Sequence, residues 1–389
     1  MNTRTETLTK PRRLRRPGRV GRILAAIGIA VVLVVAPYGV SAYLNSLSGL
    51  GEPTLVVYTY SSLFGGANCY SPVFSTVFGE FASTHHVRIV VECPSGTLVS
   101  TLRAQANAPA ADLVIGLDEL TAPLAEQYHL LIPYAPPALA NVSPALVAQI
   151  SPSFGVVPYE YGYLAIDYNS SFAQATHGAI SRATFPDFAT NHSWAQQLLV
   201  ENPSTDITGQ EFLAWQILYY QDVLHQSWTG FWNATIPWLP PPAPDWGSAF
   251  GEFTTPPGNP QLVVSYSLDP AYAAANGQAG QYNSTVAWWN GTAYGWRTIY
   301  GIGIVNGTRH LSLDQEFENW FLSGPVQSQI PTNEWEYPAN VTIPLPQVFS
   351  AAIPPSSIVA LNNDTSPAQL AQAVPGWVNT WLALYVARS

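Results

Sequence analysis

The chain has 389 residues, of which 47% are apolar and only 10% are charged, so a disordered chain is excluded and two folded lobes are within its length. Residues 1–22 carry eight basic side chains and one acidic one, whereas the rest carries six arginines against 23 acidic residues. An acidic globular part argues against nucleic-acid binding, which needs a basic surface. Lysine occurs once, at Lys10, a composition that we interpret as suited to an acidic exterior.

An uncharged apolar stretch follows the basic segment. Residues 23–44 are long enough to span a bilayer, and the basic flank at 1–22 predicts a cytoplasmic tail. We therefore expect a single-pass membrane anchor with the globular part on the extracellular or periplasmic side. A signal peptide cleaved after Ala42 is the alternative, and both interpretations export the rest of the chain.

Two further features are typical of exported proteins. Cys69 and Cys93 are expected to form a disulfide that closes a loop of about 24 residues and contributes roughly 3 kcal/mol; one of them would be a reactive nucleophile only if unpaired. Sequons of the form Asn-X-Ser/Thr predict a glycosylated surface protein. They begin at Asn141, Asn169, Asn191, Asn233, Asn283, Asn290, Asn306, Asn340 and Asn363.

Beyond a flexible spacer at 45–53, strands and helices alternate. Strands are expected at 54–59, 87–91 and 112–116, and helices at 72–83, 97–106 and 119–127. After an extended crossing at 155–168, we expect strands at 197–201, 261–265 and 296–304 and helices at 209–220, 312–322 and 367–386. Residues 233–260 contain eight prolines and predict a loop or insertion. The alternation predicts an α/β fold with a parallel sheet covered on both faces, in two halves joined by extended crossings.

No catalytic motif stands out in the sequence. Gly-x-Ser-x-Gly, His-Glu-x-x-His and Walker patterns are absent, and the seven histidines are scattered. We therefore expect a binding protein rather than an enzyme, without a metal or cofactor. Aromatic and acidic residues at expected strand ends favour a cationic ligand, although core packing explains the aromatic residues equally well. These residues are Tyr60, Trp246, Tyr266, Tyr272 and Trp335 with Asp206 and Asp269.

Five segments resemble thiamine-binding periplasmic proteins, the solute receptors of thiamine ABC importers. They are Val57–Ser62, Ala111–Asp118, Val157–Tyr163, Leu262–Tyr266 and Ile330–Pro338. The last is similar to the family's Ile-Pro-Thr-Gly-Asn-Trp-x-Tyr-Pro stretch. The resemblance implies a two-lobed type II periplasmic-binding fold with a hinge. Lobe one would comprise 54–158 and 270–389, and lobe two 159–269.

The resemblance also implies the function and the binding positions. It implies a receptor that captures thiamine between its lobes and delivers it to ABC permease subunits. The implied ligand-binding residues are Tyr60, Ser95, Gly96, Asp206, Ile207, Trp246, Tyr266, Ser267, Leu268, Asp269, Tyr272 and Trp335. Asp206 stands where the family has a serine at a helix N-terminus, a place that favours phosphate. A carboxylate there would repel phosphate, so we expect unphosphorylated thiamine; a simple N-cap of the following helix is the alternative.

Two other functions stay open at this point. The fold class includes ferric-iron receptors that bind the metal through tyrosines, and Tyr219 and Tyr220 are adjacent. The second alternative is a glycosylated surface protein without a transport role.

Overall fold

The computed structural model describes residues 52–66, 69–255 and 260–388. The predicted cytoplasmic tail, the predicted anchor at 23–44 and most of the spacer lie outside the described residues. Within these ranges, no helix is both long and apolar enough to cross a membrane. The chain divides into two units, Met1–Thr54 and Leu55–Ser389, and the second unit contains all of the described hydrophobic cores.

The strands are β1 (Thr54–Tyr58), β2 (Arg88–Glu92), β3 (Leu113–Asp118), β4 (Leu131–Ile132), β5 (Val157–Asn169), β6 (Leu198–Leu199), β7 (Leu262–Tyr266), β8 (Tyr282–Thr285), β9 (Ala287–Trp289), β10 (Thr292–Gly295), β11 (Arg297–Val305), β12 (Tyr337–Pro338) and β13 (Ile358–Ala360). The helices are α2 (Phe74–His85), α3 (Leu98–Ala104), α4 (Ala122–Gln127), α5 (Pro144–Ile150), α6 (Ser170–Ala175), α7 (Phe185–Thr190), α8 (His192–Ala195), α9 (Ile207–Leu218), α10 (Thr229–Thr235), α11 (Trp246–Thr254), α12 (Asp269–Ala275), α13 (Leu311–Phe321), α14 (Gly324–Gln327), α15 (Ile330–Asn333) and α16 (Pro367–Arg388).

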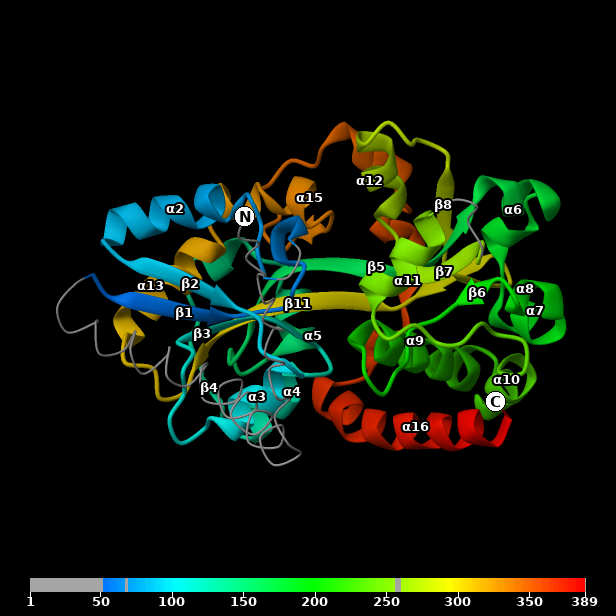
Figure 1. The fold of residues 1–389 in the computed structure, drawn as a ribbon, viewed down its shortest axis with the longest axis horizontal. Helices are drawn as coiled ribbons and strands as arrows, with labels where there is room; N and C mark the ends of the chain where they lie inside the picture. The colour runs from blue at the N-terminus through cyan, green and yellow to red at the C-terminus, as the bar shows by residue number, and fades with distance from the viewer. Residues whose placement is uncertain (1–51, 67–68, 256–259, 389) are drawn as a thin grey trace, which may run out of the picture. The chain divides into compact units, whose positions relative to one another are not determined.

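The main sheet of the described residues has ten strands. Its order is β2-β1-β3-β11-β5-β7-β6, with β4 on β11 and with β8 and β12 on β5. β1 is parallel to β3 and β6 is parallel to β7, but β11 is antiparallel to both β3 and β5. The predicted parallel sheet is therefore wrong in the middle, because the long strands β5 and β11 run past each other in opposite directions (Figure 1).

Two hydrophobic cores lie along this sheet, as the two-lobed prediction requires. The first gathers apolar residues of β1, β3, α2 and α13, and the second gathers those of α7, α9, α10 and α16. β5 links them, since Val157 belongs to the first core and Leu164 to the second. The helix α16, which the sequence assigns to lobe one, contributes Leu370, Val374 and Trp381 to the second core.

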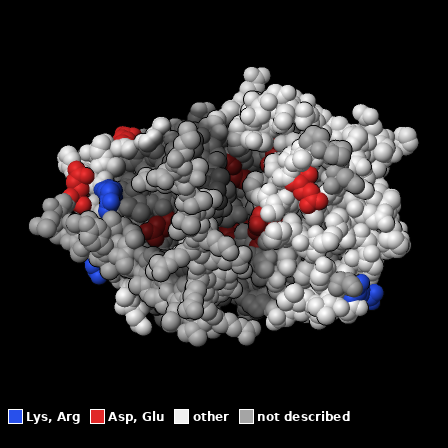
Figure 2. All heavy atoms as spheres, in the orientation of Figure 1, with Lys and Arg blue, Asp and Glu red and all other residues white. Residues whose placement is uncertain are grey.

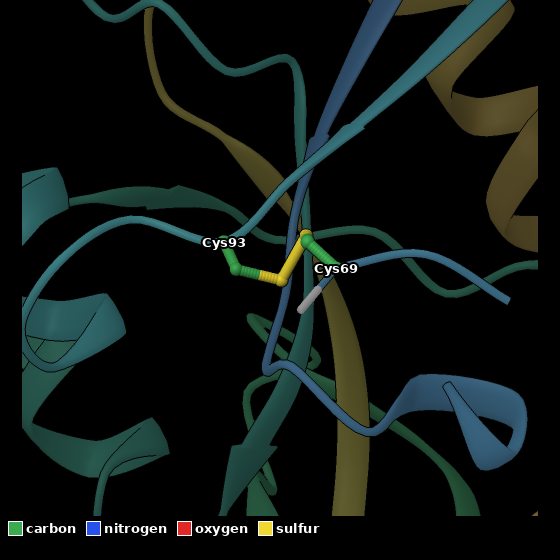
Figure 3. The surroundings of a disulfide bond; sticks show 2 residues. All are labelled: Cys69 and Cys93. Carbon is green, nitrogen blue, oxygen red and sulfur yellow. A yellow bond between two sulfur atoms is a disulfide. The ribbon is translucent and has the colours of Figure 1, made fainter. Parts of the chain in front are cut away.

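A disulfide joins the segment after β1 to the segment after β2 (Figure 3). Cys69 and Cys93 have Cα atoms 5.6 Å apart and are separated by 24 positions. The predicted pairing is present, and no free cysteine remains. A cysteine nucleophile is therefore excluded in this oxidised state.

Candidate ligand-binding cleft

Four aromatic rings from distant parts of the chain meet near the middle of the sheet, and we call them the aromatic series. The rings of Tyr60, which follows β1, and Tyr300 on β11 have centroids 5.8 Å apart. The hydroxyl of Tyr300 lies 3.2 Å from that of Tyr266 at the end of β7. Tyr266 contacts Trp246, the first residue of α11, at a centroid distance of 5.9 Å. All four side chains are half-buried, so each ring presents part of its surface to solvent or to a ligand.

A glycine makes room for the first ring of this series. Gly116 in β3 has a φ of +100°, and a Cβ atom there would lie 2.3 Å from Cδ1 of Tyr60. Any other residue would push the tyrosine away from its position. The strand that resembles the family segment is thus built around the ring of Tyr60.

Buried carboxyl groups lie behind the tyrosines. The hydroxyl of Tyr60 is 3.0 Å from that of Tyr159 and 3.4 Å from carboxylate oxygens of both Glu160 and Glu334. Glu334 also accepts a hydrogen bond from the backbone N–H of Phe64. Burial raises the pKa of Glu160 to about 8, so this group holds a proton near neutral pH.

A second acidic group lies on the other side of Tyr300. In the register of the sheet, Tyr300 pairs with Glu160 on β5 on one side and with Asp118 on β3 on the other. Burial raises the pKa of Asp118 to about 6, and burial together with the Asp118 carboxyl raises the pKa of Glu119 to about 8. On α9, the completely buried Glu211 faces these two groups, and its pKa is raised first by burial and then by Glu119.

Asp269 supports the aromatic series instead of facing an open cleft. The indole N–H of Trp246 donates to Oγ of Ser265 at 2.9 Å, and this hydroxyl donates to Oδ2 of Asp269. The backbone N–H of Tyr266 donates to the same oxygen at 3.1 Å. Asp269 is only 7% exposed, so its observed contacts hold two of the four rings in place.

Asp206 caps the helix α9. Its Oδ1 accepts a hydrogen bond from the N–H of Gly209 at 3.2 Å, which is the N-cap arrangement that the sequence left open. Two residues later, the hydroxyl of Thr208 lies 3.2 Å from that of Tyr266. The start of α9 is therefore tied directly to the aromatic series, while Ile207 packs partly buried against the second core.

The other predicted residues are more dispersed. Tyr272 and Trp335 form an edge-to-face pair with centroids 5.4 Å apart, and Tyr272 is 36% exposed. Leu268 packs in a small core with Tyr337 and Phe349, and Ser267 is completely buried. Ser95 and Gly96 lie in an exposed turn between β2 and α3, and the structure shows no contact between this turn and the described aromatic series.

Five residues near the predicted ones were not predicted from the sequence, namely Tyr159, Glu160, Tyr300, Glu334 and Glu336. Two features of the sequence could have indicated three of these residues. Glu334 and Glu336 flank Trp335 within the Ile330–Pro338 segment, and Tyr300 lies in a strand otherwise made mostly of small and apolar residues. In a chain with 10% charged residues, acidic residues inside segments that resemble the family should carry the same weight as the aromatic ones.

The surface view agrees with this description. In Figure 2, several acidic side chains lie toward the centre of this face and others on its outer left part, whereas the visible basic side chains lie on the outer parts. A separate cavity of about 420 Å³ lies between α4, α9 and α16, lined by Leu124, Gln210, Val378 and neighbouring residues. None of the predicted ligand-binding residues lines it.

Comparison with known proteins supports the resemblance seen in the sequence. No family model matches the chain. The thiamine-binding periplasmic protein of Escherichia coli (strain K12) is 26% identical over 341 residues, which cover 85% of this chain and 93% of the relative. The protein of the same name from Brucella suis is 26% identical over 336 residues, covering 85% and 92%. This chain is a relative of the thiamine-binding periplasmic proteins. The predicted family resemblance is confirmed.

Solved structures show the same fold. A periplasmic thiamin binding protein superimposes with a TM-score of 0.70 at 21% identity, covering 86% of this chain and 96% of that protein. The ferric binding protein from Campylobacter jejuni gives a TM-score of 0.67 at 13% identity, covering 85% and 99%. The periplasmic-binding fold is thus shared by thiamine-binding and iron-binding proteins. The fold therefore does not identify the ligand, which has to be inferred from the residues of the site.

Proposed function

We propose that this chain is the extracytoplasmic solute-binding protein of an ABC importer and that it captures thiamine between its two lobes. The observation that carries the proposal is the aromatic series above buried carboxyl groups, in a relative of thiamine-binding proteins. Thiamine has a permanent positive charge on its thiazolium ring, which tyrosine and tryptophan faces attract when water is excluded. Closure of the lobes about β5 and β11 would bury the ligand and present a closed shape to permease subunits.

The ligand form that we propose is unphosphorylated thiamine. The carboxylate of Asp206 already accepts a hydrogen bond at the N-terminus of α9, where a phosphate would otherwise bind. A phosphorylated ligand would have to displace or approach this negative charge.

Titration calorimetry with thiamine and thiamine pyrophosphate tests both parts of the proposal. We expect thiamine to bind more tightly than the pyrophosphate, and the substitution Asp206→Ser to reduce that preference. Tighter pyrophosphate binding by the unmodified protein would overturn the choice of ligand form. A folded protein that binds neither compound would favour the surface protein without a transport role.

The structure does not favour the ferric-iron alternative. Tyr219 is completely buried in the second core and donates its hydroxyl hydrogen to the carbonyl of Trp288 at 2.6 Å, and Tyr220 is buried beside it. No group of three or more His, Cys, Asp or Glu residues in the described ranges is arranged to hold a metal ion. We expect the purified protein to be colourless after incubation with ferric citrate; a visible charge-transfer band would revive the iron-binding function.

We further propose that residues 23–44 anchor the protein in the membrane and that its sequons are glycosylated. One sequon is an exception, because Asn340 is buried and donates from Nδ2 to the carbonyl of Leu322 at 3.2 Å. Membrane fractionation of the full-length chain, with peptide mass spectrometry of the sequons, tests both statements. Recovery in the soluble fraction with a new N-terminus after Ala42 would indicate a cleaved signal peptide.

A further inference from the structure

Glu336 is a buried acidic residue without a partner at the edge of the site. It lies between Trp335 and the short strand β12, beside β5, and is 7% exposed. Its Oε2 is buried and has no hydrogen-bond partner in the described structure. A buried polar atom without a partner is costly and therefore points to a missing ligand or to a proton on the group.

The neighbouring strand leaves space for this carboxyl group. A Cβ atom on Gly162 would lie 2.0 Å from Oε2 of Glu336. The glycine in β5 thus forms a cradle that holds the carboxyl group against the sheet. Because burial and then nearby carboxyls, that of Glu336 among them, raise the pKa of Tyr266, a member of the aromatic series, the cradle lies beside the candidate site.

Among the described residues, the titratable groups that interact with Glu336 are acids or phenols. On β5 these are Glu160 and Tyr161, at the end of β7 Tyr266, at the start of α12 Asp269, and on either side of Glu336 itself Glu334 and Tyr337. In the described ranges, no ion pair joins an arginine, lysine or histidine to these carboxyl groups.

The electrostatic result is a site with more acidic groups than basic partners among the described residues. Burial and then the Glu160 and Asp269 carboxyls raise the pKa of Glu336 well above its usual value. Several of these acids must therefore be protonated while the site is empty, since unpaired buried charges are too costly. A ligand cation that replaces one of these protons would pair with the carboxylate and remove the free-energy cost of its buried charge.

We infer that Glu336, held over Gly162 and next to Glu160, is the carboxylate that receives the positive charge of the ligand. This inference rests on the proposed function and deepens it, because it names a specificity-determining residue for that site. The ligand class is a flat organic cation without acidic groups, since an additional anionic group would face the neighbouring carboxyls as well. Binding of the cation is coupled to release of a proton, so affinity rises with pH.

Calorimetry distinguishes this role of Glu336 from a purely structural one, because only a residue that receives the cation releases its proton when the ligand binds. Titrations of thiamine into the protein near neutral pH, in two buffers of different ionisation enthalpy, measure the protons released on binding. We expect the unmodified protein to release protons. We expect Glu336→Gln to abolish most of that release and to weaken binding by about 10- to 100-fold, because the quaternary ring loses a buried opposite charge at close range.

A second variant moves the carboxyl group without removing it. Gly162→Ala places a methyl group where Oε2 lies, so it should displace Glu336 and weaken thiamine binding in the same direction. Glu318→Gln is the matched control for the acid, because Glu318 is another buried glutamate, on α13, with an unpartnered oxygen. Gly79→Ala in α2 is the control for the glycine, because a Cβ atom there meets open space.

The outcomes separate this inference from the proposed function. If Glu336→Gln and Gly162→Ala are folded by circular dichroism and bind thiamine as tightly as the unmodified protein with the same proton release, the inference is wrong while the proposed function stands. If the unmodified protein does not bind thiamine, the proposed function fails. The same variants are then titrated with N-methylpyridinium: weaker binding by Glu336→Gln supports the inference, and equal binding or no binding overturns it.

Discussion

The two aromatic groups of this protein use the same residue types for different purposes. In the second core, Phe185 and Trp215 have ring centroids 5.0 Å apart, and the indole N–H of Trp232 donates to Gln216 at 2.9 Å. These rings are completely buried. In the aromatic series, by contrast, the half-buried Tyr266 and Tyr300 contact each other through their hydroxyl groups, and the hydroxyl of Tyr60 lies 3.4 Å from a carboxylate oxygen of the buried Glu160. Carboxyl groups behind partly exposed rings, and not the number of rings, distinguish a candidate cation site from a core.

The largest difference between the two groups is expected in their response to pH. Below about pH 4 the cleft carboxyls are protonated in both the folded and the unfolded chain. As the pH rises, the unfolded chain loses these protons, whereas burial raises the pKa of Glu160 and of Glu119 and keeps both protonated up to about pH 8. The free energy of unfolding should therefore fall between these pH values, by up to about 1.4 kcal/mol per carboxyl for each pH unit that separates its pKa in the folded and unfolded chains.

Urea denaturation of the ligand-free protein at pH 5 and pH 8 measures this loss. Glu160→Gln removes one of the titrating groups, so it should make the pH dependence shallower. A stability that is equal at both pH values, or that rises with pH, would contradict the assignment of protonated carboxyls to the cleft.

A core substitution should affect stability and leave recognition intact. Trp232→Ala removes a completely buried ring and is expected to lower the free energy of unfolding by about 3–5 kcal/mol. Thiamine affinity of the folded protein should stay within about twofold, because this residue lies in the second core and not in the aromatic series. If Trp232→Ala instead kept its stability and lost affinity for thiamine, the aromatic residues of the second core would belong to the binding site.

The smallest expected effect on stability comes from single hydroxyl groups. Tyr300→Phe removes the contact with the Tyr266 hydroxyl, and Tyr219→Phe removes the hydrogen bond to Trp288. Each should lower the free energy of unfolding by about 1 kcal/mol. Only Tyr300→Phe should also weaken thiamine binding, as measured by calorimetry. Equal affinities for the two variants would remove the functional distinction between the aromatic groups.

Local pattern was sufficient for the longer elements of the fold. The apolar spacing of residues 312–322 predicted α13 (Leu311–Phe321), which buries one face, and the β-branched run at 261–265 predicted β7, whose first four residues are all buried. The proline-rich stretch hid α11 (Trp246–Thr254), whose start is capped by Asp245. The short strands β8 to β10 were missed because each has too few residues to show a period.

The site was harder to predict, because burial of an acid is a property of the folded chain. The aromatic members Tyr60, Trp246 and Tyr266 were found from the resemblance, and the structure brings them together through Tyr300. Glu336 flanks Trp335 within a segment that resembles the family, but acidic residues usually indicate a solvated surface, so the sequence alone does not predict its burial. Its environment depends on β5, β7 and α12 folding around it.

The fit between Gly162 and Glu336 has a consequence for how this site can diverge. The two positions lie in distant parts of the chain yet cannot vary independently, because a side chain at the first occupies the place of the carboxylate at the second. Homologous sequences that keep an acid at the second position should keep glycine at the first, and those that lose the acid should be free to lose the glycine. Co-variation of this pair would therefore mark the branch of relatives that shares the same preference for a cation.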